Sequence, residues 1–345
     1  MSIEFFSGAN SGSGFYSLYE GFARDKGDFL YLIKGGPGCG KSGFMKKIAI
    51  AAEERGLSVT RILCSGDPGS LDGVYIPAIK TGICDATAPH AAEPGIFGYD
   101  SCYVNLGKFC RRADSRLIPQ YTEDYKLMYR SAYSYLAAAA DIEKVPVHGL
   151  YGEKELNTVR IRARSAIIRR HSPVGSGKVR RYFISCIGRG GRSVLEGTVS
   201  ELCKQIYLLD DALGLAKFYI SEAAEAAVRR GEDIILCPSP LVPDSYEALI
   251  IPGSGLGFVS STLKINSPCC RHIHLDSIVP AERLAAHKPE LRKRQSIISE
   301  LTDAAVLYLK KAGEYHDLLE AEYKQYMDFA ALDAYTDEFI KKLFG

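Results

Sequence analysis

The sequence predicts an α/β protein built from two similar halves, each a parallel sheet flanked by helices and followed by a helical extension. Strand-like apolar runs alternate with helical patterns, a glycine-rich motif follows one of these runs, and the chain resembles itself at a nearly constant offset. At 345 residues the chain is also longer than one usual core, so we expect two domains of about 150–170 residues.

The predicted elements follow from local patterns. An apolar run at 29–33 predicts a strand, and the segment 43–52 that follows the glycine-rich motif predicts a helix. Strand-like segments follow at 58–64 and, in the second half, at 233–237. We expect helical extensions at about 120–145 and 153–170 in the first half, and at about 280–326 and 329–343 in the second.

The internal repeat relates nearly half of the chain to the other half. Glu20-Gly21 matches Glu196-Gly197, Tyr31 matches Tyr207, and Tyr135 matches Tyr308, all at an offset of 173 to 176 residues. A Pro/Gly/Ser stretch at 172–177 is typical of a linker. The predicted domains are therefore residues 1–172 and 178–345, two tandem pseudo-repeats.

The glycine-rich motif indicates a phosphate-binding P-loop, and with it a P-loop NTPase fold. The spacing G-x-x-x-x-G-K-S lets successive N–H groups face an anion at the start of a helix. We expect Lys41 to contact phosphates as a catalytic residue and Ser42 to ligate Mg²⁺. The candidate cofactor-binding residues for ATP, or another nucleoside triphosphate, are Gly35, Gly36, Pro37, Gly38, Cys39, Gly40, Lys41, Ser42 and Gly43.

An acid at the end of a neighbouring strand is needed to complete a Mg²⁺ site. Asp85 is the first candidate, because small apolar residues run into it and its counterpart in the second half is Ser260. Asp67 is the alternative and Asp72 a third candidate. His90, just beyond Asp85, is a candidate catalytic residue that would orient the attacking water or a substrate hydroxyl; Glu93 could do the same, and a packing role for His90 stays open.

The second half has lost the matching motif. In the segment 209–218, Gly214 and Lys217 stand in register with Gly38 and Lys41, but Phe218 stands where Ser42 would be. Phenylalanine offers Mg²⁺ no oxygen, and the adjacent Asp210 and Asp211 would repel phosphate. We expect a structural or regulatory second half.

Two further clusters have several interpretations. Residues 160–181 carry eight Lys and Arg and no acid, which fits a solvated helix face, an arginine lid or contact between halves, or nucleic-acid binding. Few aromatic residues interleave them, so we favour contacts within the protein over nucleic acid. Cys269, Cys270, His272 and His274 lie too close in one extended segment for more than two to share a metal, so zinc is not favoured.

Composition indicates an ordinary soluble protein, with 46% hydrophobic and 24% charged residues. The net charge of +2 does not indicate a polyanionic partner. No apolar run approaches the ~20 residues of a membrane span, and the start lacks a signal-like segment, so we expect no membrane association. Ten cysteines without a C-x-x-C pair are typical of buried thiols in a reducing compartment, which predicts the cytoplasm.

Several motifs together resemble a family of bacterial tandem P-loop proteins described as ATPases or ATP-binding proteins. The resemblance spans essentially the whole chain, and its most specific mark is Asp-x-Thr-Ala-Pro-His; it is carried by the segments 35–42, 64–67, 71–74, 85–90, 104–107 and 327–329. It implies ATP binding without naming a substrate. Both halves are typically intact in that family, so the altered second half puts a two-site mechanism in doubt here.

The leading hypothesis is therefore slow, Mg²⁺-dependent ATP hydrolysis in the first half. The alternatives are a phosphotransferase acting on a nucleotide or small molecule, and a sensor that binds ATP without hydrolysis and changes its affinity for an unknown protein partner.

Overall fold

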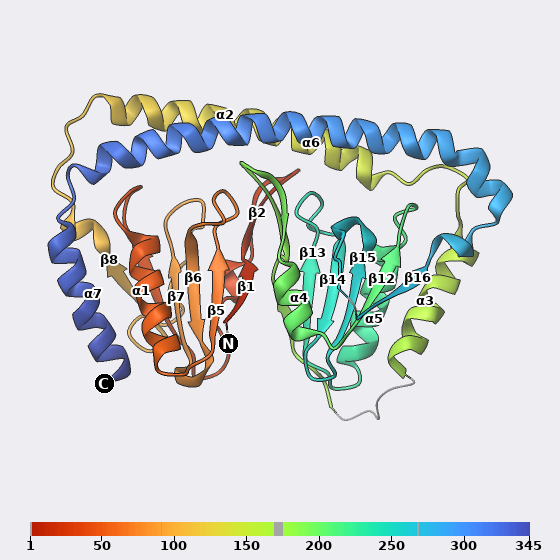
Figure 1. Ribbon diagram of the computed structural model, residues 1–345, viewed down its shortest axis with the longest axis horizontal. Coiled ribbons are helices and arrows are strands. Elements are labelled where there is room, and N and C mark those ends of the chain that lie inside the picture. Colours follow the sequence, from red (N-terminus) through yellow and green to blue (C-terminus); the bar gives the residue numbers. More distant parts are fainter. Residues whose placement is uncertain (1, 91, 169–174, 268) are drawn as a thin grey trace.

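The computed structural model describes residues 2–90, 92–168, 175–267 and 269–345. Two six-stranded sheets stand side by side beneath a pair of long helices (Figure 1). The first sheet has the strand order β1 (Ser2–Phe6), β5 (Val59–Leu63), β6 (Leu71–Ile76), β7 (Thr81–Asp85), β4 (Phe29–Lys34), β8 (Ser101–Asn105). The second has the order β9 (Val179–Arg181), β13 (Ile234–Pro238), β14 (Tyr246–Ile251), β15 (Leu256–Ser260), β12 (Gln205–Asp210), β16 (Cys270–His274).

The two sheets thus have the same strand order relative to the chain. Each half also has a two-stranded hairpin, β2 (Gly8–Ser11) with β3 (Gly14–Ser17) and β10 (Ser185–Gly188) with β11 (Gly191–Val194). The helices are α1 (Lys41–Glu54), α2 (Leu117–Lys144), α3 (Glu153–Ile168), α4 (Glu196–Leu202), α5 (Ala216–Val228), α6 (Ala281–Lys324) and α7 (Phe329–Phe344).

The sheets are mixed, which corrects the expectation of parallel sheets. β6 is antiparallel to both β5 and β7, and β14 is antiparallel to both of its neighbours. The reason is the length of the connections: residues 64–70 and 77–80 are too few for the crossover of a dozen or more residues that a parallel neighbour requires. The remaining pairs of the first sheet are parallel, including β4 with β7 and β8.

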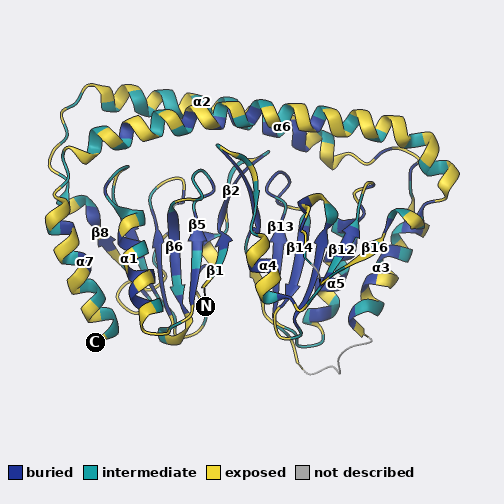
Figure 2. Ribbon diagram, viewed as in Figure 1, coloured by how far each residue is buried: buried dark blue, intermediate teal, exposed yellow. Residues whose placement is uncertain are grey.

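The central strands are buried because both faces of each sheet are covered, whereas the edge strands β9 and β16 of the second sheet have no buried residue (Figure 2). α1 packs on one face of the first sheet through Phe44, Met45 and Ile48. The opposite face shares one apolar cluster with the second sheet, which includes Leu30 of the first sheet and Ile235 of the second. Across the same junction Phe6 and Phe183 exchange two backbone hydrogen bonds, of 2.9 and 2.8 Å. The two sheets therefore share part of their core.

The helical extensions cross over between the sheets. α2 and α6 run antiparallel above both sheets (Figure 1). Tyr135 of α2 stacks on Tyr308 of α6. α3, from the first half, then packs on α5 beside the second sheet, whereas α7, from the second half, packs on α1 beside the first. Each sheet is thus covered by a helix from the other half. Of the expected linker, residues 172–174 lie outside the described residues.

Among the residues that the structure describes, no helix is both long and apolar enough for a membrane span.

Candidate functional site

The glycine loop (residues 35–40) connects the central strand β4 to α1, in the predicted strand–loop–helix order. Gly38 and Gly40 have positive φ angles of 69° and 83°, in the left-handed region that favours glycine. Gly40 caps α1, and its carbonyl accepts the N–H of Phe44 at 2.9 Å. The sequence places glycine where this backbone path requires it.

Residues of the C-terminal helices pack against the glycine loop. A Cβ atom on Gly38 would lie 2.7 Å from the backbone oxygen of Glu320, near the end of α6. A Cβ atom on Gly40 would lie 2.7 Å from the side chain of Leu332, in α7. The loop therefore needs glycine for close approach as well as for its φ angles, and it contacts elements far away in the sequence.

Lys41 lies at the opening of this loop. Its ammonium group donates to the carbonyl oxygens of Gly35 and Gly36 at 2.9 and 3.0 Å, and lies 3.5 Å from Oδ2 of Asp85. Asp85 ends β7, the strand hydrogen-bonded next to β4, and Ile33 is its register partner. The structure thus brings together the predicted lysine and the first-choice acid, both largely buried.

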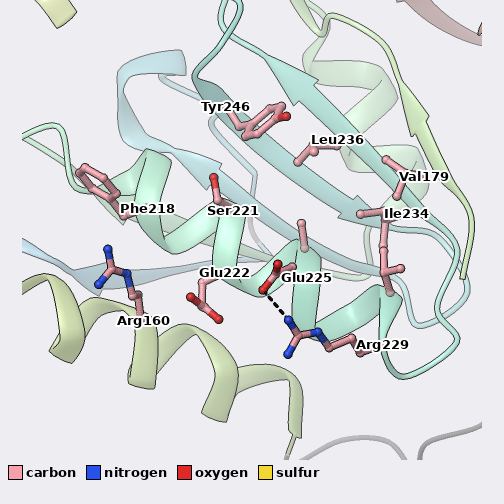
Figure 3. Close-up of a pocket in the computed structure, with 12 residues that line it drawn as sticks. Arg160, Val179, Phe218, Ser221, Glu222, Glu225, Arg229, Ile234, Leu236 and Tyr246 are labelled. Carbon is pink, nitrogen blue, oxygen red and sulfur yellow. Dashed lines mark hydrogen bonds and ion pairs between the residues drawn. The ribbon is translucent and has the colours of Figure 1, made fainter. Parts of the chain in front are cut away.

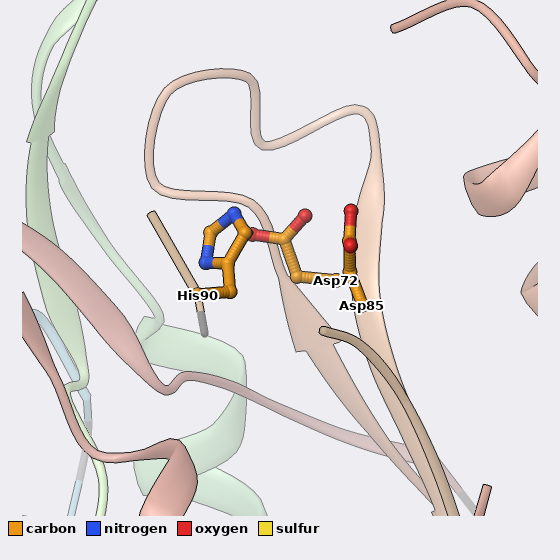
Figure 4. A group of neighbouring side chains, drawn as sticks. All are labelled: Asp72, Asp85 and His90. Atoms are coloured by element: carbon orange, nitrogen blue, oxygen red, sulfur yellow. The ribbon is translucent and has the colours of Figure 1, made fainter. Parts of the chain in front are cut away.

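Asp72 and His90 complete a buried group beside Asp85 (Figure 4). Because β6 is antiparallel, its first residues lie at the same sheet edge as the last residues of β7, which brings Asp72 to Asp85. The three side chains each offer a ligand atom within 4.8 Å of the others, and His90 Nε2 lies 3.5 Å from Asp72. Burial raises the pKa of Asp72, while the nearby His90 opposes this shift.

His90 is held in the fold by aromatic contacts. The rings of Phe15 and Tyr19 meet its imidazole edge to face, at centroid distances of 5.0 and 5.2 Å. Among the described residues, nothing hydrogen-bonds its buried Nδ1 atom. Burying a polar nitrogen without a partner costs free energy, so this atom is free to meet a bound water or ligand.

Ser42 and Asp67, two predicted metal ligands, lie in different surroundings. The Ser42 hydroxyl accepts the N–H of Leu71 at 2.9 Å, next to Asp72 in the chain. Asp67 instead pairs with Arg189 at 2.9 Å and accepts a hydrogen bond from Ser70 at 3.0 Å. Asp85 is the acid that lies next to Lys41. Asp67, the alternative acid, instead forms an ion pair with Arg189 of the second half.

Cys39 has a raised thiol pKa, although it lies at a helix start, where thiol pKa values are often lowered. Its side chain is only 2% exposed, and burial raises the pKa of its thiol, although Lys41 acts in the opposite direction. The residue fills space inside the loop.

The loop of the second half differs in length as well as sequence. Five residues (211–215) separate β12 from α5, against six in the glycine loop. Tyr219 N–H bonds to Leu215 as Phe44 N–H bonds to Gly40. Counted from these bonds, Lys217 corresponds to Ser42 and not to Lys41, which corrects the register expected from the sequence. Its ammonium lies 5.3 Å from the ring centre of Phe218.

An acid occupies this second loop. Asp211 accepts the backbone N–H of Leu215, and burial raises its pKa to about 6. Asp210, at the end of β12, contacts His272 at 2.8 Å and His274 at 2.5 Å. Asp211 therefore stands where the first half has Gly35, the first loop glycine, and Asp210 stands where the first half has Lys34.

The described part of the basic segment makes contacts within the protein. Arg164 pairs with Glu222 of α5, and Arg180 pairs with Asp25 of the first half at 2.6 Å. Because α3 packs beside the second sheet, its arginines do not lie over the glycine loop. Arg169 and Arg170 lie outside the described residues.

A cleft of about 630 Å³ lies elsewhere, between α3, α5 and the second sheet (Figure 3). Its lining is a mixture of apolar side chains with Arg160, Glu222, Glu225 and Arg229. The ion pair between Glu225 and Arg229, drawn in Figure 3, occupies two of these charges. No cluster like that of Asp72, Asp85 and His90 appears among the residues that line it.

The sequence reasoning ranked Asp72 last among the acids and missed Arg189. The short connection before β6 indicates that this strand is antiparallel to its neighbours, and this feature of the sequence could have pointed to Asp72. For Arg189, the signal was one cation within a Gly-Arg-Gly-Gly hairpin turn.

Comparisons with family models, curated proteins and solved structures returned no match in any of the three.

Proposed function

We propose that the lobe containing the first sheet binds a nucleoside triphosphate, ATP, at the glycine loop and hydrolyses it slowly with Mg²⁺. One observation carries the proposal: the Lys41 ammonium lies between the loop carbonyls and Asp85, which ends the neighbouring parallel strand. A phosphate group in the loop would replace these carbonyls as the partner of Lys41 and would meet the N–H groups at the start of α1.

The topology supports a P-loop NTPase fold built as two tandem pseudo-repeats. The loop follows a central strand and leads into a helix that packs on the sheet. The shared strand order, the paired hairpins and the matching helix order all support a common origin of the halves.

The residues at the site fit a magnesium ion. Mg²⁺ prefers oxygen ligands, and the Ser42 hydroxyl and the Asp85 carboxylate supply them, with Asp72 beside Asp85. We assign Ser42 and Asp85 to the metal. The ion would neutralise charge on the phosphates.

In hydrolysis, the oxygen of a water bonds to the γ-phosphorus while the bond to the bridging oxygen breaks. The electron pair of that bond passes to ADP, and the proton of the water leaves with the inorganic phosphate. Lys41 holds the phosphate charge, and His90, oriented by Asp72, positions the water. Asp72, Asp85 and His90 are all buried, which would keep bulk solvent from this side of the site.

The second lobe is proposed to be regulatory or structural. Its loop is shorter and carries Asp211, which disfavours phosphate. α6 packs against Gly38 and α7 packs against Gly40, so the glycine loop is in direct contact with both helices. The same contact favours a second candidate function, a sensor in which ATP binding alone changes the arrangement of α6 and α7 and with it the affinity for a protein partner.

Phosphate release by the purified chain, measured with Mg²⁺ and ATP, separates these functions. A hydrolase releases phosphate with water alone, at a rate that falls when Mg²⁺ is chelated. A phosphotransferase requires an added acceptor such as a nucleoside, and a sensor binds ATP without release. Rates unchanged by RNA or DNA would support the absence of a nucleic-acid partner.

A further inference from the structure

The hairpin β10–β11 of the second half extends to the first lobe. The two hairpins cross between the sheets, beneath α2 and α6 (Figure 1). At the tip, a Cβ atom on Gly188 would lie 2.5 Å from the backbone oxygen of Ser65, so the hairpin backbone rests directly on the turn after β5. The next residue, Arg189, pairs with Asp67 and with Asp317 of α6, each at 2.9 Å.

These contacts place the guanidinium group of Arg189 near the glycine loop. Asp317 precedes Glu320 by about one helical turn, and the Glu320 backbone lies against Gly38. Asp67 belongs to the turn that ends at Leu71, whose N–H binds the Ser42 hydroxyl. Arg189 therefore pairs with two segments, the turn after β5 and α6, each of which also contacts the proposed phosphate site.

The other hairpin supplies an internal control. The tip of β2–β3 reaches the matching turn of the second lobe, where Gly12 N–H donates to Leu241 at 3.1 Å. Aligned by their strand pairs, Gly12 stands where Arg189 does. The turns share one hydrogen bond, Ser70 to Asp67 and Ser245 to Val242, both 2.8 Å, so Val242 stands where Asp67 does.

The cation and its acid thus occur only at the lobe with the intact glycine loop. Docking a hairpin onto a lobe does not require them, because the β2–β3 hairpin docks without either. Both acids that hold Arg189 are also well exposed, with side chains 43% and 62% accessible for Asp67 and Asp317. Such exposed pairs are weak, so the guanidinium can exchange partners.

We propose that Arg189 is a catalytic residue that leaves Asp67 and Asp317 to contact the γ-phosphate of bound nucleotide. This inference rests on the proposed function of the glycine loop. A planar guanidinium matches two phosphate oxygens, and an arginine supplied by a second lobe stabilises charge during phosphoryl transfer. It also makes the second half a working part of the site.

The test compares affinity for ADP with affinity for a non-hydrolysable ATP analogue, in the full chain with Mg²⁺. Arg189→Ala should lower the preference for the triphosphate at least about tenfold, because a charge-assisted contact to the γ-phosphate is lost, while ADP affinity stays the same. Arg189→Lys keeps the positive charge but loses the planar guanidinium, so its preference for the triphosphate should lie between those of wild type and Arg189→Ala. Thermal unfolding of each variant shows that the fold is retained.

Two controls separate this role from a purely structural ion pair. Asp317→Asn removes a partner of Arg189 but keeps the guanidinium, so triphosphate preference should not fall. Arg164→Ala, an arginine in an ion pair of the other lobe, should change nothing. An unchanged preference in Arg189→Ala, or an equal loss in Asp317→Asn, would overturn the inference. Wild-type protein that binds neither nucleotide would instead refute the proposed function, and the inference with it.

Discussion

Lys41 and Asp85 lie 3.5 Å apart at the carboxyl edge of the first sheet, one at the start of α1 and the other at the end of β7. Neither charge is well solvated, with side chains 15% and 9% exposed, so the ion pair offsets part of the cost of burying both charges. Oδ1 of Asp85 also accepts hydrogen bonds from the backbone N–H of Thr87 at 2.8 Å and from its hydroxyl at 2.5 Å. The Lys41 ammonium also donates to two loop carbonyls. The arrangement places a positive charge at the glycine loop beside Asp85, the acid that we propose as a metal ligand.

Asp85→Asn is expected to weaken Mg²⁺-dependent ATP binding at least about tenfold, because a charged metal ligand is lost. Isothermal titration with ATP at several Mg²⁺ concentrations measures the effect. Asp67→Asn is the matched control, since Asp67 pairs with Arg189 and is not our assigned ligand. A larger loss of metal dependence from Asp67→Asn would show that the acid was assigned wrongly.

Gly38→Ala is expected to lower the free energy of unfolding by about 1–3 kcal/mol, since its φ of 69° is strained for alanine and the new Cβ meets Glu320. Gly43→Ala, inside α1 with open space around its Cα, should instead raise stability by up to about 1 kcal/mol. Urea unfolding of both variants measures the difference. Equal changes in the free energy of unfolding for the two variants would mean that Glu320 of α6 does not pack against Gly38.

Leu332→Ala tests the packing of α7 on the loop. This side chain is 4% exposed and contacts Gly40, so its truncation should cost about 2–5 kcal/mol of unfolding free energy. Leu318→Ala, at a side chain 46% exposed on α6, should cost less than about 1 kcal/mol. A small effect at Leu332 would argue that α7 is only loosely attached to the first lobe.

Asp211→Asn should make stability less dependent on pH. The pKa of Asp211 is raised from 3.8 to about 6, so the folded chain binds its proton more tightly than the unfolded chain. Its contribution to stability is complete below pH ~4 and is lost as the pH rises through about 6. The whole pKa difference corresponds to about 3 kcal/mol, less where water reaches the side chain.

Asparagine stays neutral and still accepts the Leu215 N–H, so the variant should gain stability relative to wild type between pH 4 and pH 7. Thermal unfolding across this range measures the gain. Asp244→Asn, at an exposed acid of the same lobe, is the control variant. A constant difference in Asp211→Asn would contradict the raised pKa.

Much of the local structure could be predicted from the sequence. The strand–loop–helix unit around Lys41 and the helices α2, α3, α6 and α7 of the extensions follow from glycine placement and apolar periodicity, which are local signals. The antiparallel β6 could have been predicted from its short connections. The crossing of α3 and α7 to opposite sheets could not, because helix pairing depends on three-dimensional packing that periodicity does not encode.

The site was predictable to the same degree. Asp85 stood out because it ends an apolar strand, and the structure puts it beside Lys41. Asp72 reaches Asp85 only through the reversed direction of β6, and Arg189 reaches Asp67 only through a hairpin 122 residues further along the chain. The expected alignment of Lys217 with Lys41 was wrong because the loop of the second half is one residue shorter. A constant offset between the two halves cannot reveal such a deletion.

We propose that one chain binds one nucleotide, at the glycine loop. Isothermal titration of ATP with Mg²⁺ into wild type, Lys41→Ala and Lys217→Ala tests it most directly. We predict one site per chain in wild type, at least about tenfold weaker binding in Lys41→Ala and unchanged binding in Lys217→Ala. Two sites per chain, or equal losses from both lysines, would contradict the account.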